Sequence, residues 1–241
     1  YPLKHSFSPA YFRKKFEQEG IKAHYKLFPL EHVSELPDLI DQYPSLEGLN
    51  VTLPYKKHVI PYLSDVKGVA REIQSVNTLI IQRSPELLLT GYNTDVTGFR
   101  RSLENHLKKP VDHALILGTG GTAQTVRYVL KQMGISFLFV SRFCRENKNS
   151  CISYQDLHSM VLEDYPLIIN TTPLGMYPET DSFPDIPYHS LTPKHLLFDV
   201  IYNPVETRFL QYGREAGANT VNGTEMLQFQ ADESWKLWNA L

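Results

Sequence analysis

The chain has 241 residues, of which 42% are hydrophobic, and a formal net charge of −2 at pH 7. This length and composition fit one large domain or two modest ones. The near-neutral charge argues against nucleic acid as a partner. No apolar run approaches the roughly 20 residues that cross a bilayer, so we expect no membrane association.

Two cysteines, Cys144 and Cys151, lie in a polar connecting stretch. Their number does not make a disulfide framework, and their spacing does not indicate a metal site. We therefore expect a cytoplasmic enzyme with reduced thiols. Since the sequence lacks an initiator methionine and starts abruptly, we also expect the native chain to be longer.

Helical and strand-like patterns alternate over the first 107 residues. Ser8 and Pro9 indicate the N-cap and first residue of a helix that Gly20 ends, and Ser84-Pro85 indicates the turn of a hairpin. The elements expected here are a helix over 9–19, a strand over 23–28, a helix over 33–43, a strand over 46–51, helical segments over 55–63 and 65–73, hairpin strands over 76–81 and 87–92, and a helix over 95–107.

The alternation continues to the end of the chain. The elements expected here are strands over 114–117, 135–140, 167–170 and 196–200, and helices over 123–133, 154–162, 205–216 and 224–239. Strands that alternate with helices predict an α/β protein with mostly parallel sheets.

A glycine-rich loop joins the strand over 114–117 to the following helix. Gly118 permits a tight turn, Gly120 lets the backbone approach a pyrophosphate, and Ala123 allows close packing of helix on strand. The helix N-terminus would hold the phosphates. Glycine turns also occur for packing alone, but the flanking strand and helix favour dinucleotide binding. The residues assigned to this loop are Gly118, Thr119, Gly120, Gly121, Thr122 and Ala123.

The end of the next strand predicts which dinucleotide is bound. An NAD site would place Asp or Glu there to accept a hydrogen bond from the ribose 2′-hydroxyl. This chain has Ser141 and Arg142, with Arg145 just beyond. Guanidinium groups can bind a 2′-phosphate through bidentate hydrogen bonds. The residues therefore favour NADP, although surface arginines are also common in ordinary loops.

Polar residues near element ends in the first half are candidates for substrate binding. Ser6 and Ser8 at a helix N-terminus could bind a carboxylate, whereas the simpler interpretation is that Ser8 only caps its helix. Lys56 follows a turn through Pro54, where a lysine is usually just solvated. Asp95 could likewise do no more than cap the helix that it begins.

Taken together, these motifs resemble the shikimate dehydrogenase family nearly from end to end. The matching segments are KHSFSP (4–9), NVTLPYK (50–56), SVNTL (75–79), NTDVTGF (93–99), LGTGGTA (117–123), NTTPLGMYP (170–178), FDVIYNP (198–204) and NGTEML (222–227). The resemblance implies NADPH-dependent reduction of 3-dehydroshikimate to shikimate in aromatic amino-acid biosynthesis. The family usually begins with a short strand before PLKHS, which this sequence lacks.

The resemblance also implies roles for individual residues. Lys56 matches the catalytic lysine and Asp95 its carboxylate partner. The substrate ligands are Ser6, Ser8, Thr52, Asn77, Tyr202 and Gln230. The cofactor contacts, besides the glycine-rich loop, are Ser141, Arg142, Arg145, Thr172, Met176 and Gly223. No metal ion is expected, because the nicotinamide cofactor carries the redox step.

The resemblance and the patterning together predict two domains. Residues 1–96 with 222–241 would form the substrate-binding catalytic domain, and residues 97–221 a Rossmann-type NADP-binding domain. The protein is expected to be a monomer or a homodimer. Three alternatives are an NAD-preferring quinate/shikimate dehydrogenase, a reductase of another hydroxy acid, and a non-catalytic NADP sensor. The last would lack Lys56 or Asp95, and both are present.

Overall fold

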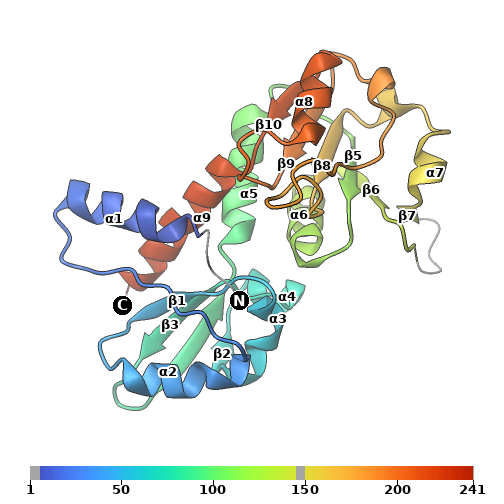
Figure 1. Cartoon of the computed structure of the whole chain (residues 1–241). Coiled ribbons are helices and arrows are strands. Elements are labelled where there is room, and N and C mark those ends of the chain that lie inside the picture. The colour runs from blue at the N-terminus through green and yellow to red at the C-terminus, as the bar shows by residue number, and fades with distance from the viewer. Residues whose placement is uncertain (1–5, 145–149, 241) are drawn as a thin grey trace. The chain divides into compact units, whose positions relative to one another are not determined.

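The computed structural model describes residues 6–144 and 150–240. Its contacts divide the chain into two compact units (Figure 1). The first unit comprises Tyr1–Thr94 and Ala231–Leu241, and the second comprises Asp95–Gln230. No helix in the described part of the chain is long and apolar enough to cross a membrane.

The first unit is built on a four-stranded sheet with the order β1-β3-β4-β2. Its strands are β1 (Gly48–Asn50), β2 (Asp65–Val66), β3 (Thr78–Gln82) and β4 (Leu88–Tyr92). The hairpin of β3 and β4 is confirmed, and β1 also pairs with β3 in antiparallel fashion. The expectation of mostly parallel strands is wrong for this sheet, because a short hairpin loop can only join antiparallel neighbours.

Helices and 3₁₀ turns make up the rest of the first unit. They are α1 (Ser8–Glu19), η1 (Val33–Glu35), α2 (Leu36–Gln42), α3 (Tyr55–His58), η2 (Ile60–Tyr62) and α4 (Val69–Ile73). Helix α1 ends at Gly20 in the left-handed conformation (φ 65°), as its sequence predicts. The N-cap position, however, is Phe7 and not Ser8. The hydroxyl of Ser8 is therefore not used to cap its helix.

Two other predictions for the first unit are wrong. Residues 65–66 form the short strand β2 and not the start of a helix. Residues 23–28 have the alternating pattern of a strand but pair with no strand among the described residues. A strand requires a hydrogen-bonded neighbour, and side-chain alternation alone does not supply one.

The second unit is built on a six-stranded parallel sheet with the order β10-β9-β8-β5-β6-β7. Its strands are β5 (His113–Leu117), β6 (Ser136–Val140), β7 (Cys151–Ile152), β8 (Leu167–Asn170), β9 (Leu196–Asp199) and β10 (Asn219–Val221). Residues 114–117 and 167–170 are almost fully buried, as in a parallel sheet that is covered on both faces. The α/β class is thus confirmed, whereas the short strands β7 and β10 were not predicted.

The helices of this unit follow the predicted order with shifted ends. They are α5 (Asp95–His106), α6 (Gly121–Gln132), α7 (Tyr154–Leu157) and α8 (Arg208–Glu215), with 3₁₀ turns η3 (Leu162–Asp164) and η4 (Tyr188–Ser190). The last helix, α9 (Thr224–Trp238), belongs to this unit up to Gln230 and to the first unit from Ala231. The chain passes from β5 to β6 and β7 on one side, then crosses to β8, β9 and β10 on the other. Ligands of such sheets bind where the order reverses, beyond the carboxyl ends of the strands.

Helices α5 and α9 approach closely at Gly98. A Cβ atom at this position would lie 2.5 Å from the backbone oxygen of Met226 and 3.0 Å from Cβ of Gln230. The first distance is shorter than real Cβ contacts and the second is tighter than most of them. A backbone oxygen within a helix cannot move aside like a flexible side chain. Glycine at residue 98 is therefore required by packing.

We predict that Gly98→Ala destabilises the protein. Alanine stabilises a helix relative to glycine by about 1 kcal/mol. The clash of its Cβ atom with Met226 opposes this gain, because overpacking of a closely packed site typically costs about 1–3 kcal/mol. Chemical denaturation should show a lower free energy of unfolding. Glu104→Ala, at an exposed position of the same helix, is the control and should change it by less than about 0.5 kcal/mol. A Gly98→Ala protein as stable as the wild type would contradict this packing argument.

Candidate active site

A buried network of polar side chains surrounds the predicted ligand Asn77 in the first unit. Asn77 is 2% exposed, and its Oδ1 accepts from the backbone N–H of Thr94 at 2.7 Å while its Nδ2 donates to Thr94 Oγ1 at 2.9 Å. Thr78 Oγ1 lies 2.8 Å from Ser234 Oγ and 3.2 Å from Thr94 Oγ1. Buried polar groups are costly unless paired, so this network fixes the orientation of the Asn77 amide.

Tyr25 links this network to Ser8. The Tyr25 hydroxyl donates to Asn50 Oδ1 at 3.0 Å, and Asn50 Nδ2 donates to Ser234 Oγ at 2.9 Å. Burial raises the pKa of Tyr25 to about 12, while the hydrogen bond between its side chain and Ser8 acts in the opposite direction. The structure thus brings two predicted substrate ligands, Ser8 and Asn77, into one connected set. Ser6 is half-buried just before α1.

The predicted catalytic lysine lies on a short helix after a tight turn. Lys56 is half-buried in α3, and its carbonyl accepts from the N–H of Val76 at 2.8 Å. Thr52 is exposed in the preceding turn, where its carbonyl accepts from the N–H of Tyr55 at 2.9 Å. The Tyr55 hydroxyl donates to the carbonyl of Leu30 at 3.0 Å. These bonds hold the backbone on which Lys56 is presented.

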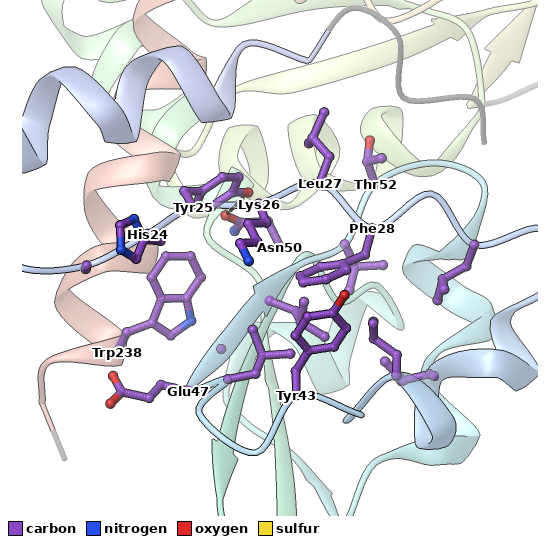
Figure 2. A pocket seen from close by; sticks show the side chains of 18 of the residues that line it. His24, Tyr25, Lys26, Leu27, Phe28, Tyr43, Glu47, Asn50, Thr52 and Trp238 are labelled. Carbon is purple, nitrogen blue, oxygen red and sulfur yellow. Dashed lines mark hydrogen bonds between the residues drawn. The ribbon is translucent and has the colours of Figure 1, made fainter. Parts of the chain in front are cut away.

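Figure 2 shows an apolar groove of about 460 Å³ in the first unit, between the extended residues 22–28 and β1. Phe28 and Tyr43 pack edge to face in it, with ring centroids 4.8 Å apart. Gly48 and Asn50 form the non-hydrogen-bonded pairs with β3, so their backbone N–H and C=O groups point away from that strand. Among the predicted ligands, Thr52 contributes to the lining, and neither Lys56 nor Asp95 does. The groove is therefore an apolar cavity beside the edge of β1 that is unpaired in the described part of the chain, and it lacks the acid–base residues expected of the substrate site.

The glycine-rich loop follows β5 at the point where the strand order of the second sheet reverses. Gly118 has φ 99°, and a Cβ atom there would lie 3.0 Å from Thr172 Cγ2. Cβ atoms at Gly120 and Gly121 would meet no protein atom within 4 Å. Gly120 is the N-cap of α6 and provides no side-chain cap. The backbone at this helix N-terminus is thus open beside Gly120 and Gly121, which fits the approach of a phosphate and a bound dinucleotide.

Ser141 and Arg142 lie directly after β6, as predicted. Ser141 is half-buried and its N–H donates to the carbonyl of Ile152 at 3.0 Å, whereas Arg142 is exposed. Arg145 lies outside the described residues. Contrary to our expectation of free thiols, Cys144 and Cys151 form a disulfide, with Cα atoms 5.7 Å apart. Pairing of β7 with β6 places Cys151 beside the loop that carries Cys144, which the sequence spacing alone did not indicate.

A buried carboxylate, Asp199, lies at the end of β9. Burial raises its pKa to about 6, opposed by hydrogen bonds from Thr207, Ile201 and Asn170. The ordinary pKa of an unfolded Asp is about 3.9. Because the folded protein binds this proton more tightly than the unfolded chain, protonation of Asp199 adds to the free energy of unfolding. This contribution is complete below about pH 4 and is lost as the pH rises through about 6. Burial and the nearby Asp199 both raise the pKa of Tyr188.

Most of the other predicted residues of the second unit lie on loops or at the start of a helix, whereas Gln230 lies within α9. Tyr202 is half-buried in the loop after β9, and Asp95 is half-buried as the first residue of α5. Gln230 is 7% exposed, and its Nε2 donates to the carbonyl of Leu227 at 2.9 Å. A Cβ atom at Gly223 would lie 2.2 Å from the carbonyl oxygen of Val200, so only glycine fits there. Met176 is 47% exposed.

Comparison with known proteins gives matches over the whole chain. Residues 1–79 match the model of the shikimate dehydrogenase substrate binding domain. A protein of Carboxydothermus hydrogenoformans named shikimate dehydrogenase (NADP(+)) is 35% identical over all of this chain and 90% of its own length. The chain belongs to the shikimate dehydrogenase family.

Further members of this family agree in sequence and fold. A Clostridium beijerinckii protein of the same name is 37% identical and aligns with 98% of this chain and 88% of its own length. The crystal structure of a chorismate mutase/shikimate 5-dehydrogenase fusion protein from Clostridium acetobutylicum is 35% identical. It superposes with a TM-score of 0.84 over 99% of this chain and 88% of its own. The fold class predicted from the sequence is thereby confirmed.

Some residues of the hydrogen-bonded networks in the two units were not predicted. They are Tyr25, Asn50, Thr78, Ser234, Asn170, Asp199 and Thr207. For Asn170 and Asp199 a signal was present, since each is a polar residue that ends an otherwise apolar strand. No comparable signal marks Ser234, which reaches Thr78 across 156 residues of sequence.

We predict that Thr78→Val destabilises the first unit. Thr78 is fully buried, and valine keeps its shape but removes the hydroxyl that bonds to Ser234 Oγ and accepts from Asn50 Nδ2. Such a loss costs about 1–3 kcal/mol. Denaturation curves should show it, with Thr90→Val as the matched control on the neighbouring strand β4. Equal stabilities of the two variants would show that the network contributes little.

Proposed function

We propose that this chain reduces 3-dehydroshikimate to shikimate with NADPH, as a step of aromatic amino-acid biosynthesis. The observation that carries the proposal is the match to shikimate dehydrogenases (NADP(+)) over the full length of the chain. Such a match includes both the polar residues of the first unit and the glycine-rich loop of the second. The protein is thus an oxidoreductase of this family that uses NADP.

The substrate is a polyhydroxylated acid and requires several hydrogen-bonding partners. Ser6 and Ser8 at the start of α1 receive its carboxylate, supported by the N-terminal end of that 12-residue helix. Asn77 is held by Thr94 in one orientation and presents an amide to a substrate hydroxyl. Thr52, Tyr202 and Gln230 supply the remaining contacts in this assignment.

Lys56 and Asp95 carry the acid–base chemistry. When NADPH is bound, it supplies the hydride that adds to the carbonyl carbon of the substrate. Negative charge then develops on the carbonyl oxygen, where the Lys56 ammonium stabilises it and donates a proton. Asp95 orients the lysine and a substrate hydroxyl. In the reverse direction neutral Lys56 accepts the proton again.

The second unit provides the residues that fit NADP. Gly118–Ala123 would hold the pyrophosphate, since the open positions beside Gly120 and Gly121 allow close approach. Ser141 and Arg142, with Arg145, bind the 2′-phosphate of the adenosine ribose. Thr172, Met176 and Gly223 would surround the ribose and nicotinamide. No carboxylate follows β6 before Glu146, so the residues do not favour an NAD-preferring quinate/shikimate dehydrogenase.

The assignment of domains is part of the same proposal. Residues 1–96 with 222–241 act as the substrate-binding catalytic domain, and residues 97–221 as the NADP-binding domain. The enzyme works in the cytoplasm as a monomer or homodimer.

The function is tested by nicotinamide absorbance with purified full-length protein and shikimate, with NADP or NAD, and again with quinate. Rapid, shikimate-dependent formation of NADPH with little response to NAD or quinate is expected. Turnover of quinate with NAD would instead identify the NAD-preferring dehydrogenase. Cofactor binding without turnover of either substrate would indicate another hydroxy acid or a sensor.

We predict that Lys56→Ala abolishes turnover while NADP still binds. The proton donor is lost, whereas the glycine-rich loop is unchanged; general acid catalysis is typically worth about 10²–10⁴-fold in rate. Steady-state kinetics and calorimetric titration with NADP measure the two effects. Lys57→Ala, an exposed lysine on the same helix α3, is the control and should retain wild-type kinetics. Near-normal turnover of Lys56→Ala would contradict the assignment of Lys56 as the proton donor.

We also predict that Arg142→Ala weakens NADPH far more than NADH. Only NADPH carries the 2′-phosphate, and loss of a charge-assisted hydrogen bond should raise its KM by about 10- to 100-fold. Arg127→Ala, at an exposed position of α6, is the control for a general loss of positive charge. Equal losses for the two cofactors would disprove the phosphate contact.

A further inference from the structure

Asp199 is joined to three different segments of the second unit. Its Oδ1 accepts from Asn170 Nδ2 at 3.1 Å and from the backbone N–H of Ile201 at 3.0 Å. Its Oδ2 accepts from Thr207 Oγ1 at 2.6 Å. Asp199 and Asn170 are fully buried, and Thr207 is 1% exposed. The carboxylate thus connects the end of β8, the loop after β9 and the start of α8.

The bond to Asn170 extends to Thr172. Asn170 Oδ1 accepts from the backbone N–H of Thr172 at 3.0 Å and from Thr172 Oγ1 at 2.6 Å. Because Asn170 Nδ2 is held by Asp199, the amide of Asn170 cannot turn its oxygen away from Thr172. Thr172 in turn lies beside Gly118 of the glycine-rich loop.

The bond to Ile201 fixes the loop that carries Tyr202. The Ile201 N–H donates to Asp199, and the Ile201 carbonyl accepts from the N–H of Gly223 at 2.9 Å. The backbone there has little freedom, since Gly223 approaches Val200 too closely for any side chain. One carboxylate therefore fixes the positions of Thr172 and Tyr202, and through Ile201 the loop that contains Gly223.

We propose that Asp199 is a positioning residue for the reaction, which holds Thr172 through Asn170 and Tyr202 through the Ile201 backbone in the places where cofactor and substrate contact them. The proposal rests on the function proposed above for Thr172 and Tyr202. Asp199 itself has no exposed surface and touches neither ligand. Displacement of reacting groups by about 1 Å can lower rates about 100-fold. A residue that only holds the contacting residues in place, as Asp199 does, can therefore affect catalysis without contacting substrate or cofactor.

The role assigned to Asp199 is geometric, and Asp199→Asn tests this. The remaining Oδ1 of asparagine still accepts from Asn170 and Ile201. Its Nδ2 takes the place of Oδ2, and the hydroxyl of Thr207 can rotate and accept from it, because a hydroxyl is both donor and acceptor. Asparagine therefore keeps all three connections without the charge, whereas alanine loses them all.

The experiment compares Asp199→Ala, Asp199→Asn and Asn170→Ala in the full-length protein. We expect Asp199→Ala to lower kcat/KM for shikimate about 10- to 100-fold and to weaken NADP in calorimetry. Asp199→Asn should stay within about threefold of the wild type in both. Without any cofactor, amide hydrogen exchange by NMR should show faster exchange at Ile201 and Thr172 in the alanine variant only. Asn170→Ala should lose protection at Thr172 but keep it at Ile201.

Leu197→Ala is the control for destabilisation without a change in the network, since Leu197 is a fully buried residue of the same strand. It should lower the melting temperature yet keep wild-type kinetics and exchange at Ile201 and Thr172. Wild-type behaviour of Asp199→Ala would overturn the proposal, and so would an Asp199→Asn protein as impaired as Asp199→Ala. If the wild type does not turn over shikimate, the proposed function fails, while hydrogen exchange and NADP binding still decide the role of Asp199.

Discussion

The parallel alignment of β5, β8 and β9 is the constraint on which the candidate cofactor site depends. In register, Leu117 lies opposite Asn170, and Asn170 lies opposite Asp199. Because the strands run in the same direction, the three loops that follow them leave the sheet at one edge. Gly118, Thr172 and Tyr202 belong to these loops, although more than 80 residues of sequence separate the first from the last.

Buried polar side chains then hold these loops in place. In the second unit Asp199 and Asn170 connect neighbouring strand ends, and in the first unit Asn50, Asn77, Thr78 and Ser234 connect two strands to the C-terminal helix. Apolar packing tolerates several arrangements of similar volume, whereas a buried polar group requires particular partners. The two networks therefore set orientation, and the apolar cores supply most of the stability.

Close backbone approaches complete this arrangement. Gly98 lies against α9 and Gly223 against the loop after β9, at distances that admit no Cβ atom. Gly118 instead requires a positive φ and lies against Thr172. The three glycines thus have two physical reasons for their places, close approach and positive φ, and the close approaches become visible only when the neighbouring elements are present.

The sequence by itself determined the α/β class, most helices and buried strands, and the chemistry expected of Lys56, Asp95 and the glycine-rich loop. The fold class, the elements and the loop depend on local patterns such as apolar runs, capping residues and spacing, which a single segment contains. The roles of Lys56 and Asp95 are instead implied by the resemblance to a known family, because their local patterns also fit a solvated lysine and a helix cap. The role of each of these residues stays a prediction until it is tested by substitution.

Only the tertiary structure decided which polar residues meet, which strands pair and which cysteines join. Residues 23–28 carry a strand pattern without a strand partner, and Asp65–Val66 pairs with β4 against its helical pattern. Ser234 reaches Thr78, and Cys151 reaches Cys144, through the packing of other elements. A hydrogen-bonded partner that is distant in sequence leaves no mark on the local pattern, because its identity depends on the path of the whole chain.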